Sequence, residues 1–338
     1  MRHLTATAVL FALVANLSAA EPIADAQKAA ERSLAFLAKD GLAWKEKRQC
    51  ASCHHVPMTL WSLNEAKRSG YAIDEKALAD LTAFTVAADD RAKLFARGPQ
   101  QPKKLVSLGP LLLSLALQAG ETKDKATRER LDKALSVLAT DQTAEGFWQL
   151  ADGRLPMIAS PDVMTSLTLL ALPSQGGPET KETKAAREKA MKWLASAAPD
   201  DTLQSTALRL VLRQRLGASS KELQPLAKQI LSKQNADGGW SQTKEMASDA
   251  FATGQGLYAL VAAGVGPEDA AIKKAQAFLV KTQKPDGSWT MTSRPMKPGG
   301  AGSKDVAPIT HAGTAWGTLG LVRSAPKSPR TDAPAKNK

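Results

Sequence analysis

The two cysteines of the 338-residue chain lie close together, in Cys50-Ala51-Ser52-Cys53-His54. Two thiols at this spacing can add to the vinyl groups of one haem, and the histidine that follows them can bind the iron. We therefore expect one covalent haem c, with Cys50 and Cys53 as the thioether residues and His54 as an axial ligand. The sequence leaves the sixth ligand open: His311 could reach the opposite face of the iron, and the other candidates are Met58, Met291 and Met296.

Three other chemistries remain open for the same segment. Cys50 and Cys53 could form a disulfide in an oxidising compartment. They could form a thioredoxin-like redox pair, although the surroundings show helical periodicity and no βαβ pattern. Cys50, Cys53, His54 and His55 could together bind zinc.

A second group of polar residues stands where apolar helical stretches begin. Each aspartate there has a structural interpretation, because a helix N-cap carboxylate accepts a free backbone N–H. Asp200 and Asp201 also have a catalytic one, as proton donors, and Asp249 is expected to form a hydrogen bond with His311. The residues expected to line a central cavity are Asp162, Asp249, Phe251, His311 and Trp316.

An internal repeat indicates what positions these residues. Gln142–Trp148, Gln234–Trp240 and Gln283–Trp289 share a Gln, a Gly four residues later and a Trp two after that. A degenerate copy with Trp193 is expected between the first two. Each copy follows a helical pattern that the Gly can end, because glycine adopts the left-handed conformation readily.

The helices alternate between a type with one polar face and a more apolar type, which predicts an outer and an inner layer. Six outer–inner pairs can close into an all-α toroid, an (α/α)6 barrel, with almost no β-structure. The twelve expected helices are 24–38, 57–68, 76–88, 105–118, 127–138, 163–172, 185–195, 203–216, 223–233, 250–264, 270–281 and 312–322.

The repeat resembles the QW repeats of squalene-hopene cyclases and related terpene cyclases, and the paired layout is similar to that of protein prenyltransferase β subunits. The resemblance covers most of residues 23–323. It implies the toroid fold and an apolar or isoprenoid small molecule as ligand.

Two local resemblances concern the chemistry. Residues 198–203, with Asp200 and Asp201, resemble the Asp-x-Asp-Asp-Thr-Ala motif of class II terpene cyclases, whose middle Asp protonates an alkene, although Ala198 replaces the first Asp. Asp249 and His311 resemble two zinc ligands of prenyltransferases, but Phe251 stands where the thiolate would be. Residues 44–70 resemble bacterial secreted toroid proteins that carry a CxxCH segment before the first inner helix.

The two ends of the chain differ from its body. Residues 1–20 have the basic start, short apolar run and small-residue end of a secretory signal, so we expect an exported protein, periplasmic or extracellular. Residues 21–324 form the single toroid domain, with the CxxCH insertion at 50–54, and residues 325–338 form a basic tail expected to be disordered.

The composition narrows the function classes. The formal net charge is +12, but Lys and Arg are spread along the chain without a basic stripe, so nucleic-acid binding is not expected. No apolar run is long enough to cross a membrane. The leading hypothesis is an exported toroid with one haem c in a redox or electron-transfer role with a partner protein. The alternatives are a terpene cyclase-like isomerase using Asp200 and Asp201, and a non-catalytic binding scaffold.

Overall fold

The protein is described here by a computed structural model. The part of the chain that the structure describes comprises residues 5–48, 55–87, 125, 129, 135–136, 138–148, 160–172, 180–198, 200–295 and 302–328. The expected helix 105–118 and most of the expected helix 127–138 lie outside these residues.

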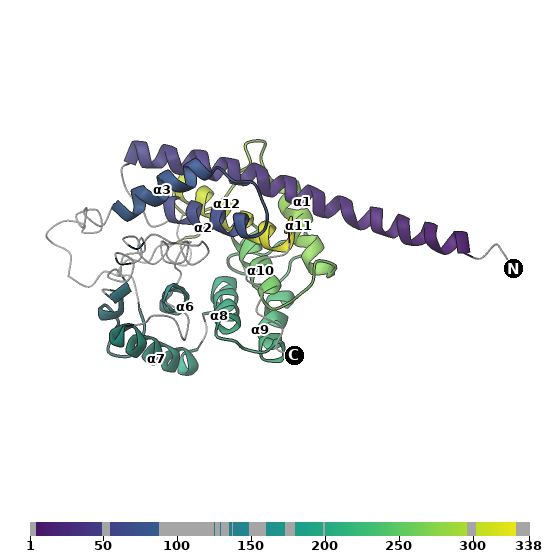
Figure 1. Cartoon of the computed structure of the whole chain (residues 1–338). Coiled ribbons are helices and arrows are strands. Elements are labelled where there is room, and N and C mark those ends of the chain that lie inside the picture. Colours follow the sequence, from purple (N-terminus) through teal and green to yellow (C-terminus); the bar gives the residue numbers. More distant parts are fainter. Residues whose placement is uncertain are drawn as a thin grey trace.

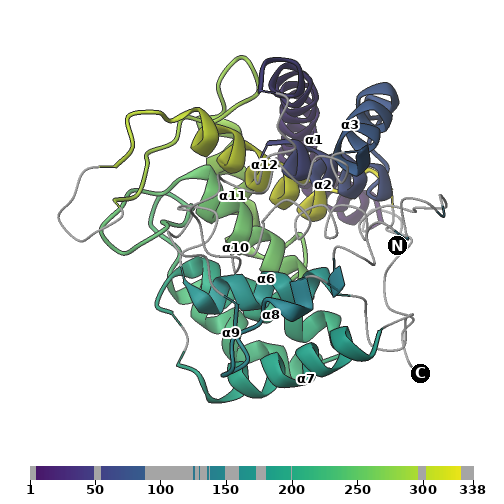
Figure 2. The ribbon, with the colours of Figure 1, turned by 90° about the vertical axis from the view of Figure 1, so that its left-hand side faces the viewer.

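The described helices form two layers around a common centre (Figures 1 and 2). The inner helices are α2 (His55–Arg68), α6 (Pro161–Ala171), α8 (Leu203–Arg215), α10 (Ala250–Ala262) and α12 (Ala307–Ser324). The outer helices are α1 (Thr5–Arg48), α3 (Glu75–Ala87), α7 (Lys181–Ser196), α9 (Ser220–Ser232) and α11 (Ala270–Thr282).

Each inner helix packs against the next, in the order α6, α8, α10, α12, α2, so that the last inner helix lies beside the first. On the outside, α1 packs against α11, which closes the outer layer at the same place. Among the described residues there are isolated β-bridges only. The predicted all-α toroid is confirmed.

The sequence decides which layer a helix joins. In α10, buried side chains occur all round the helix from Ala250 to Leu260, whereas α9 buries only Leu223, Ala227 and Ile230, which share one face. A helix that is apolar all round needs neighbours on every side, and an amphipathic helix needs them on one.

The three repeat turns, Gln142–Trp148, Gln234–Trp240 and Gln283–Trp289, connect successive helix pairs in the same way. In each, the Gln side-chain amide donates to the carbonyl of its own Gly and to a carbonyl of the next outer helix. The pairs are Gln142 with Gly146 and Ala186, Gln234 with Gly238 and Ala271, and Gln283 with Gly287 and Ala29. Because Ala29 belongs to α1, the last repeat turn joins the end of the ring to its beginning.

The Trp of each repeat turn is buried under the pair that it joins. Its indole N–H donates to the end of the preceding outer helix, at Leu138, Ile230 or Leu279, over 2.7–2.9 Å. Its backbone N–H donates to a threonine of the following inner helix, Thr165, Thr253 or Thr314. The predicted structural role of the repeat therefore agrees with the described contacts.

Glycine is required in these turns for two reasons. Gly146, Gly238 and Gly287 have φ values of +106°, +88° and +89°, in the left-handed region that other residues avoid. A Cβ at any of them would also collide with the backbone of the next outer helix.

Several boundaries differ from the expectation. The helix expected at 24–38 is part of the longer α1, whose first part projects from the ring (Figure 1). Trp193 lies within α7 and packs against Phe147 at 5.0 Å, so it does not form a fourth repeat turn. The segment expected as a disordered tail starts ordered, because Tyr71 donates to the carbonyl of Ala325 and Lys327 pairs with Glu31.

Candidate functional site

The CxxCH segment lies between α1, which ends at Arg48, and α2, which begins at His55. Cys50, Cys53 and His54 are outside the described residues, so their predicted role in haem attachment stays a prediction. The described residues on both sides of the segment show where it is anchored.

His55, directly after the motif, is buried in a stack of three rings. It lies between Trp44 of α1, at a centroid distance of 3.7 Å, and His311 of α12, at 4.2 Å. The Nε2 atom of His55 is 3.6 Å from a carboxylate oxygen of Asp40. The end of the motif is thus fixed to the place where the ring closes.

His311 is fully enclosed and both of its ring nitrogens face protein atoms. Nδ1 is 2.6 Å from Asp40 Oδ2, and Nε2 is 2.9 Å from the carbonyl oxygen of His55 and 3.2 Å from Thr59 Oγ1. To bind iron, His311 would have to give up one of these bonds. In the described arrangement it holds the start of α2, and its role as sixth ligand stays a prediction.

Asp40, His55 and His311 are a group of three potential metal ligands, with one ligand atom each within 4.8 Å of the others. The expected hydrogen bond between Asp249 and His311 does not form, because His311 pairs with Asp40 instead. Asp249 bonds to Gln242. Asp249 and His311, which resemble two prenyltransferase zinc ligands in the sequence, therefore have different partners in the structure.

Asp249 is the carboxyl group with the most unusual environment among the described residues. It is the N-cap of α10, where Oδ1 accepts the N–H of Ala252 at 2.8 Å, and Oδ2 accepts from the amide of Gln242 at 2.7 Å. Burial nevertheless raises the pKa of Asp249 to about 6, since desolvation outweighs these hydrogen bonds. The residue keeps some solvent contact.

Arg294 adds a positive charge to the same region. Desolvation lowers the pKa of its guanidinium, while the charges of Asp200 and Asp249 act in the opposite direction. Two carboxylates from the starts of neighbouring inner helices therefore share the field of one arginine. Arg294 lies just before the loop that begins at residue 296, which is outside the described residues.

The two aspartates predicted as proton donors are placed differently from each other. The Oδ1 atom of Asp200 accepts the backbone N–H of Thr202 at 2.7 Å, and Thr202 is the actual N-cap of α8. The Asp201 side chain is fully exposed and pairs with Lys233 at 3.2 Å. Asp201 thus lies at the surface, paired with an ammonium group, and not in an enclosed site.

Asp162 is buried, and both of its carboxylate oxygens accept hydrogen bonds. Its carboxylate accepts from Arg209 Nε at 2.7 Å and from the hydroxyl of Ser205, both on α8. The N-cap of α6 is Ser160, one position before Pro161. Asp162 is therefore a link between α6 and α8, and capping by Asp162 is a wrong prediction because the N-cap lies two residues earlier, at Ser160.

Phe251 and Trp316 belong to a cluster of four buried rings, the inner aromatic cluster, made of Trp61, Phe251, Tyr258 and Trp316. Trp316 has the three other rings around it, at centroid distances of 5.2–6.4 Å and with edge-on geometry. Edge-to-face packing is a favourable arrangement for aromatic rings. The cluster joins α2, α10 and α12.

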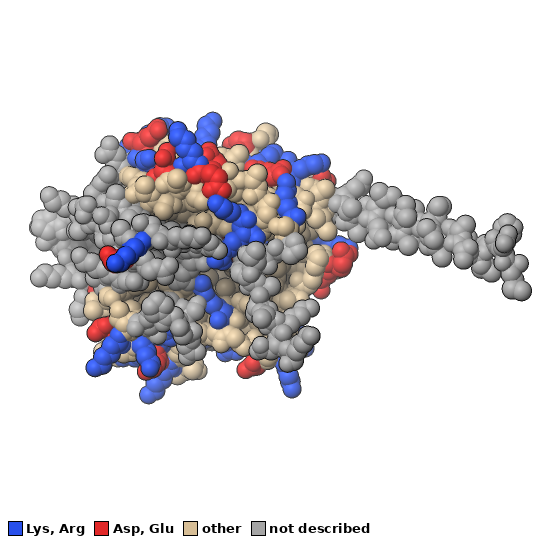
Figure 3. Space-filling model, viewed as in Figure 1, with Lys and Arg blue, Asp and Glu red and all other residues tan. Residues whose placement is uncertain are grey.

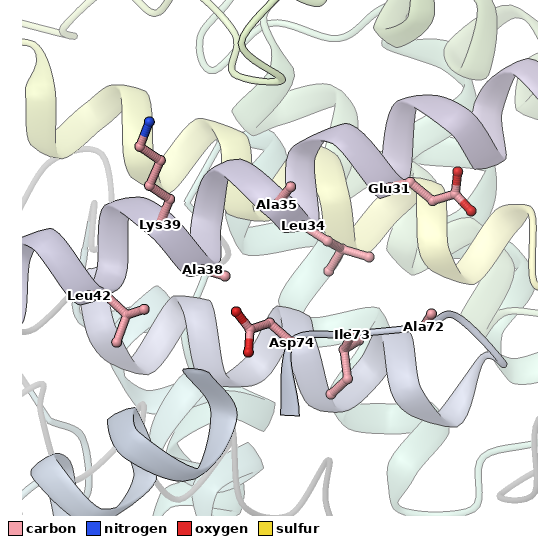
Figure 4. A pocket seen from close by; sticks show the side chains of 9 residues that line it. All are labelled: Glu31, Leu34, Ala35, Ala38, Lys39, Leu42, Ala72, Ile73 and Asp74. Carbon is pink, nitrogen blue, oxygen red and sulfur yellow. The ribbon is translucent and has the colours of Figure 1, made fainter. Parts of the chain in front are cut away.

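A pocket of about 390 Å³ lies elsewhere, on the side of α1 that faces residues 72–74 (Figure 4). Leucine and isoleucine form its apolar part and three charged side chains stand at its edge. Its lining residues are Glu31, Leu34, Ala35, Ala38, Lys39, Leu42, Ala72, Ile73 and Asp74. None of the residues predicted from the sequence to act in a site belongs to it.

The surface agrees with the charge pattern of the sequence. On the face shown in Figure 3, Lys and Arg are interspersed with Asp and Glu over the described surface. In the part of the chain that was searched, no helix combines the length and the apolar character needed to cross a membrane.

Comparison with known proteins supports the architecture. Residues 180–292 match the family model of the squalene-hopene cyclase N-terminal domain, from α7 to the third repeat turn. No curated protein sequence matches the chain.

Solved structures with a similar fold include two variants of the type II terpene cyclase MstE from Scytonema. One is in complex with geranylgeranyl dihydroxybenzoate, its substrate, and the other with merosterolic acid A, its product. For each, the identity is 16%, the TM-score is 0.53, and the match covers 90% of this chain and 99% of that chain. The chain has the α/α toroid fold of these cyclases.

Sequence reasoning missed the partners of the candidate residues. Asp40 lies beyond the end of the expected first helix, and nothing in its neighbourhood along the chain relates it to His311, 271 residues away. Gln242 and Arg294 lie in loops after the second and third repeat turns. Nothing in the sequence indicated that Gln242 or Arg294 would lie near Asp249.

Proposed function

We propose that the protein acts on an isoprenoid or similarly apolar unsaturated molecule by acid catalysis, with Asp249 as the proton donor. The observation that carries this is the carboxyl of Asp249, held at the start of inner helix α10 with its pKa raised to about 6 by burial. A carboxyl in such an environment retains its proton at a pH where an exposed aspartate has lost it.

The surroundings of Asp249 suit both products of a proton transfer, the carboxylate and the cation. When its proton passes to an alkene carbon, a C–H bond forms and the positive charge moves to the neighbouring carbon. The carboxylate left behind accepts from Ala252 and Gln242 and feels the charge of Arg294. Phe251, two residues along, belongs to the inner aromatic cluster, whose π faces attract cations. Loss of a proton or capture of water completes the reaction.

The comparisons favour the same class of ligand. The structures that share the fold are described as binding a geranylgeranyl-bearing substrate and its product. The proposed donor differs from the one predicted from the sequence, because burial raises the pKa of Asp249, whereas the Asp201 side chain is fully exposed and Asp200 accepts the backbone N–H of Thr202. It keeps the terpene cyclase-like interpretation and changes the residue.

The test is product formation from prenylated substrates by the full chain, measured by mass spectrometry from pH 5 to pH 8. We expect turnover that falls as pH rises through about 6, since the protonated fraction of Asp249 then falls about tenfold per pH unit. Asp249→Asn should abolish turnover and retain the helix cap, because Asn also caps well.

Asp269→Asn is the matched control. Asp269 caps the outer helix α11 by accepting the N–H of Ala271 at 2.8 Å, so the same substitution is made at an equivalent position on the other layer. Turnover by Asp249→Asn equal to wild type, or no turnover of any prenylated substrate by the wild type, would contradict the proposal.

A second candidate function is suggested by the CxxCH segment. We propose that the protein is exported and that Cys50, Cys53 and His54 hold a haem c. The donor set of two thiols and an imidazole fits this group, and the stack of Trp44, His55 and His311 anchors the segment's end beside the ring closure. Bound there, the group would supply one-electron redox chemistry, with a protein as redox partner.

Haem attachment is tested independently of turnover. The full chain, exported in a host that carries the haem c attachment machinery, should give a pyridine haemochrome spectrum of covalent haem, and Cys50→Ala with Cys53→Ala should not. Folded, exported wild type without covalent haem would overturn this candidate. Analysis of the mature N-terminus, expected near Glu21, tests export in the same preparation.

A further inference from the structure

The inner helices α2, α10 and α12 run in the same direction, so their residues meet in layers. Trp61, Phe251 and Trp316 meet in one layer, and Glu65, Tyr258 and Arg323 meet further along all three helices. The first layer is aromatic, whereas the second is charged. Both layers contain a residue from the same face of α10.

That face points toward the centre of the ring. Phe251, Gln255 and Tyr258 are four and three residues apart, and so share one side of α10. Gly256 lies on a different side, where a Cβ would contact the ring of Trp240 in the second repeat turn, outside the inner layer. Gln255 therefore lies on the inner side, between the two aromatic residues.

Three hydrogen-bond donors on α10 and α12 have no partner in the described structure. They are Gln255 Nε2, Trp316 Nε1 and Arg323 Nε, and each atom is buried. Gln255 is 2% exposed and Trp316 is 3% exposed. Buried donors are normally paired, because an unpaired one loses its hydrogen bonds to water without replacement. In the described structure, none of these three donors has an acceptor.

The charges beside these donors are mostly positive. Arg323 lies over the ring of Tyr258 at 3.8 Å and is 3.4 Å from Glu65, which also accepts from the Tyr258 hydroxyl at 2.9 Å. Arg215 of α8 and Arg68 of α2 act electrostatically on the same group. One carboxylate and three guanidinium groups thus interact electrostatically in this region, and Arg323 is the one paired with Glu65.

Arg215, in the last turn of α8, interacts electrostatically with this charged group. The residue is exposed, yet desolvation lowers the pKa of its guanidinium; Tyr258 and Glu65 oppose this effect, and the charges of Arg323 and Arg68 add to it. Its Nη1 atom donates to the carbonyl of Leu170 at 2.8 Å, which leaves other donors of the group available.

Arginines near the ends of helices also have a purely structural explanation, because the helix dipole favours positive charge there. This explains their position in the last turns of α8 and α12. It does not provide an acceptor for Arg323 Nε, and it does not concern Gln255 or Trp316, which lie in the middle of their helices.

We propose that the inner side of α10 and α12 binds the oxyanion end of an apolar molecule, a prenyl carboxylate or a prenyl phosphate. Arg323 and Arg215 supply the charge, Gln255 and Trp316 donate hydrogen bonds, and the inner aromatic cluster contacts the apolar part. Tyr258 follows Asp249 by nine residues on α10, or about 13 Å along the helix axis. The anionic end of the molecule is thus bound away from the proton donor, and in this respect the inference deepens the proposed function.

The experiment is calorimetric titration of the full chain with farnesyl phosphate, farnesoic acid and farnesol. We expect at least one of the two anions to bind tenfold or more tightly than the neutral alcohol, and their order identifies the preferred oxyanion. Arg323→Gln should weaken anion binding at least tenfold and leave farnesol binding within twofold. Equal affinity for anions and alcohol would overturn the inference.

Two further variants keep the test decisive. Arg213→Gln is the matched control, since Arg213 is also in the last turn of α8 but is exposed and is not among the groups facing Arg215, and binding should stay within twofold. Trp316→Phe removes one donor and keeps an aromatic ring, so it should weaken anion binding several-fold even if Arg323→Gln fails to fold. Unchanged anion affinity in Trp316→Phe and in a folded Arg323→Gln would overturn the inference.

Failure of the proposed function is distinguishable from failure of this site. Asp249→Asn should bind the anion with wild-type affinity, because Asp249 lies at the other end of α10. A wild type that binds the anion and forms no product would retain the site and lose the catalytic proposal. A wild type that forms product with no preference for an anion would do the opposite.

Discussion

The repeat turns and the inner wall formed by α10 and α12 use similar residue types in opposite ways. In the turns, the Gln and Trp side-chain N–H groups donate to backbone carbonyls. In the wall, Gln255 and Trp316 are 2% and 3% exposed, more buried than the half-buried Gln234, yet Gln255 Nε2 and Trp316 Nε1 have no partner in the described structure. The difference separates residues that hold the ring together from residues that are available to a ligand.

The largest expected effect breaks a repeat turn. Trp240→Ala removes a fully buried indole that bonds the end of α9 and packs against Gly256. We expect a loss of about 3–5 kcal/mol in the free energy of unfolding, from the cavity and the lost hydrogen bond together. Chemical denaturation measures it, and a loss below about 1 kcal/mol would contradict the structural role.

The next effect concerns the Gln of the same turn. Gln234→Leu removes two hydrogen bonds of 2.9 Å, to Gly238 and to Ala271 of the next outer helix. We expect a loss of about 2 kcal/mol in unfolding free energy, at roughly 1 kcal/mol for each bond. The same measurement on Gln283→Leu should give a similar value, since that turn has the same contacts with α1.

The third effect depends on pH and concerns Asp249, at the start of α10. The native pKa of Asp249 is about 6, above its ordinary value of 3.8, so ionisation destabilises the folded state. The wild type should lose about 2 kcal/mol relative to Asp249→Asn as pH rises from about 4 through 6, allowing for partial solvent screening. Denaturation of both proteins at pH 4 and pH 7.5 checks this, and a pH-independent difference would exclude the raised pKa.

The smallest effect has the opposite sign to the Gln234→Leu result. Gln255→Leu replaces a buried amide whose N–H group has no partner with an apolar side chain of similar size. We expect the free energy of unfolding without ligand to rise by up to about 1 kcal/mol. A loss as large as that of Gln234→Leu would show that the two glutamines have the same role.

Much of the fold followed from local patterns. The Gln, Gly and Trp of the repeat act within one turn and its two neighbouring helices, so their spacing indicated the repeat, and the alternation of amphipathic and apolar helices in six pairs predicted the layers and the closure. Trp193 was misread because a Trp near the end of an outer helix looks the same in sequence whether it lies in the helix or after it.

The site was predicted less completely. The starts of the inner helices were the right places to look, but Asp200, Asp201 and Asp249 are indistinguishable by residue type. Their surroundings separate them, since Asp249 is desolvated and bonded to Gln242, whereas Asp201 is exposed beside Lys233, and the tertiary structure decides these surroundings. The pairing of His311 with Asp40, rather than with Asp249, depends in the same way on which helices meet where the ring closes.

The sequence by itself determined the toroid, which helices form its outer and inner layers, and the presence of a CxxCH segment before the first inner helix. Only the tertiary structure decided which carboxyl has its pKa raised by burial and which buried donors lack a partner. The physical reason is range: turns and helix faces are set by residues within a few positions, whereas desolvation and hydrogen-bond satisfaction depend on every group that the fold brings near.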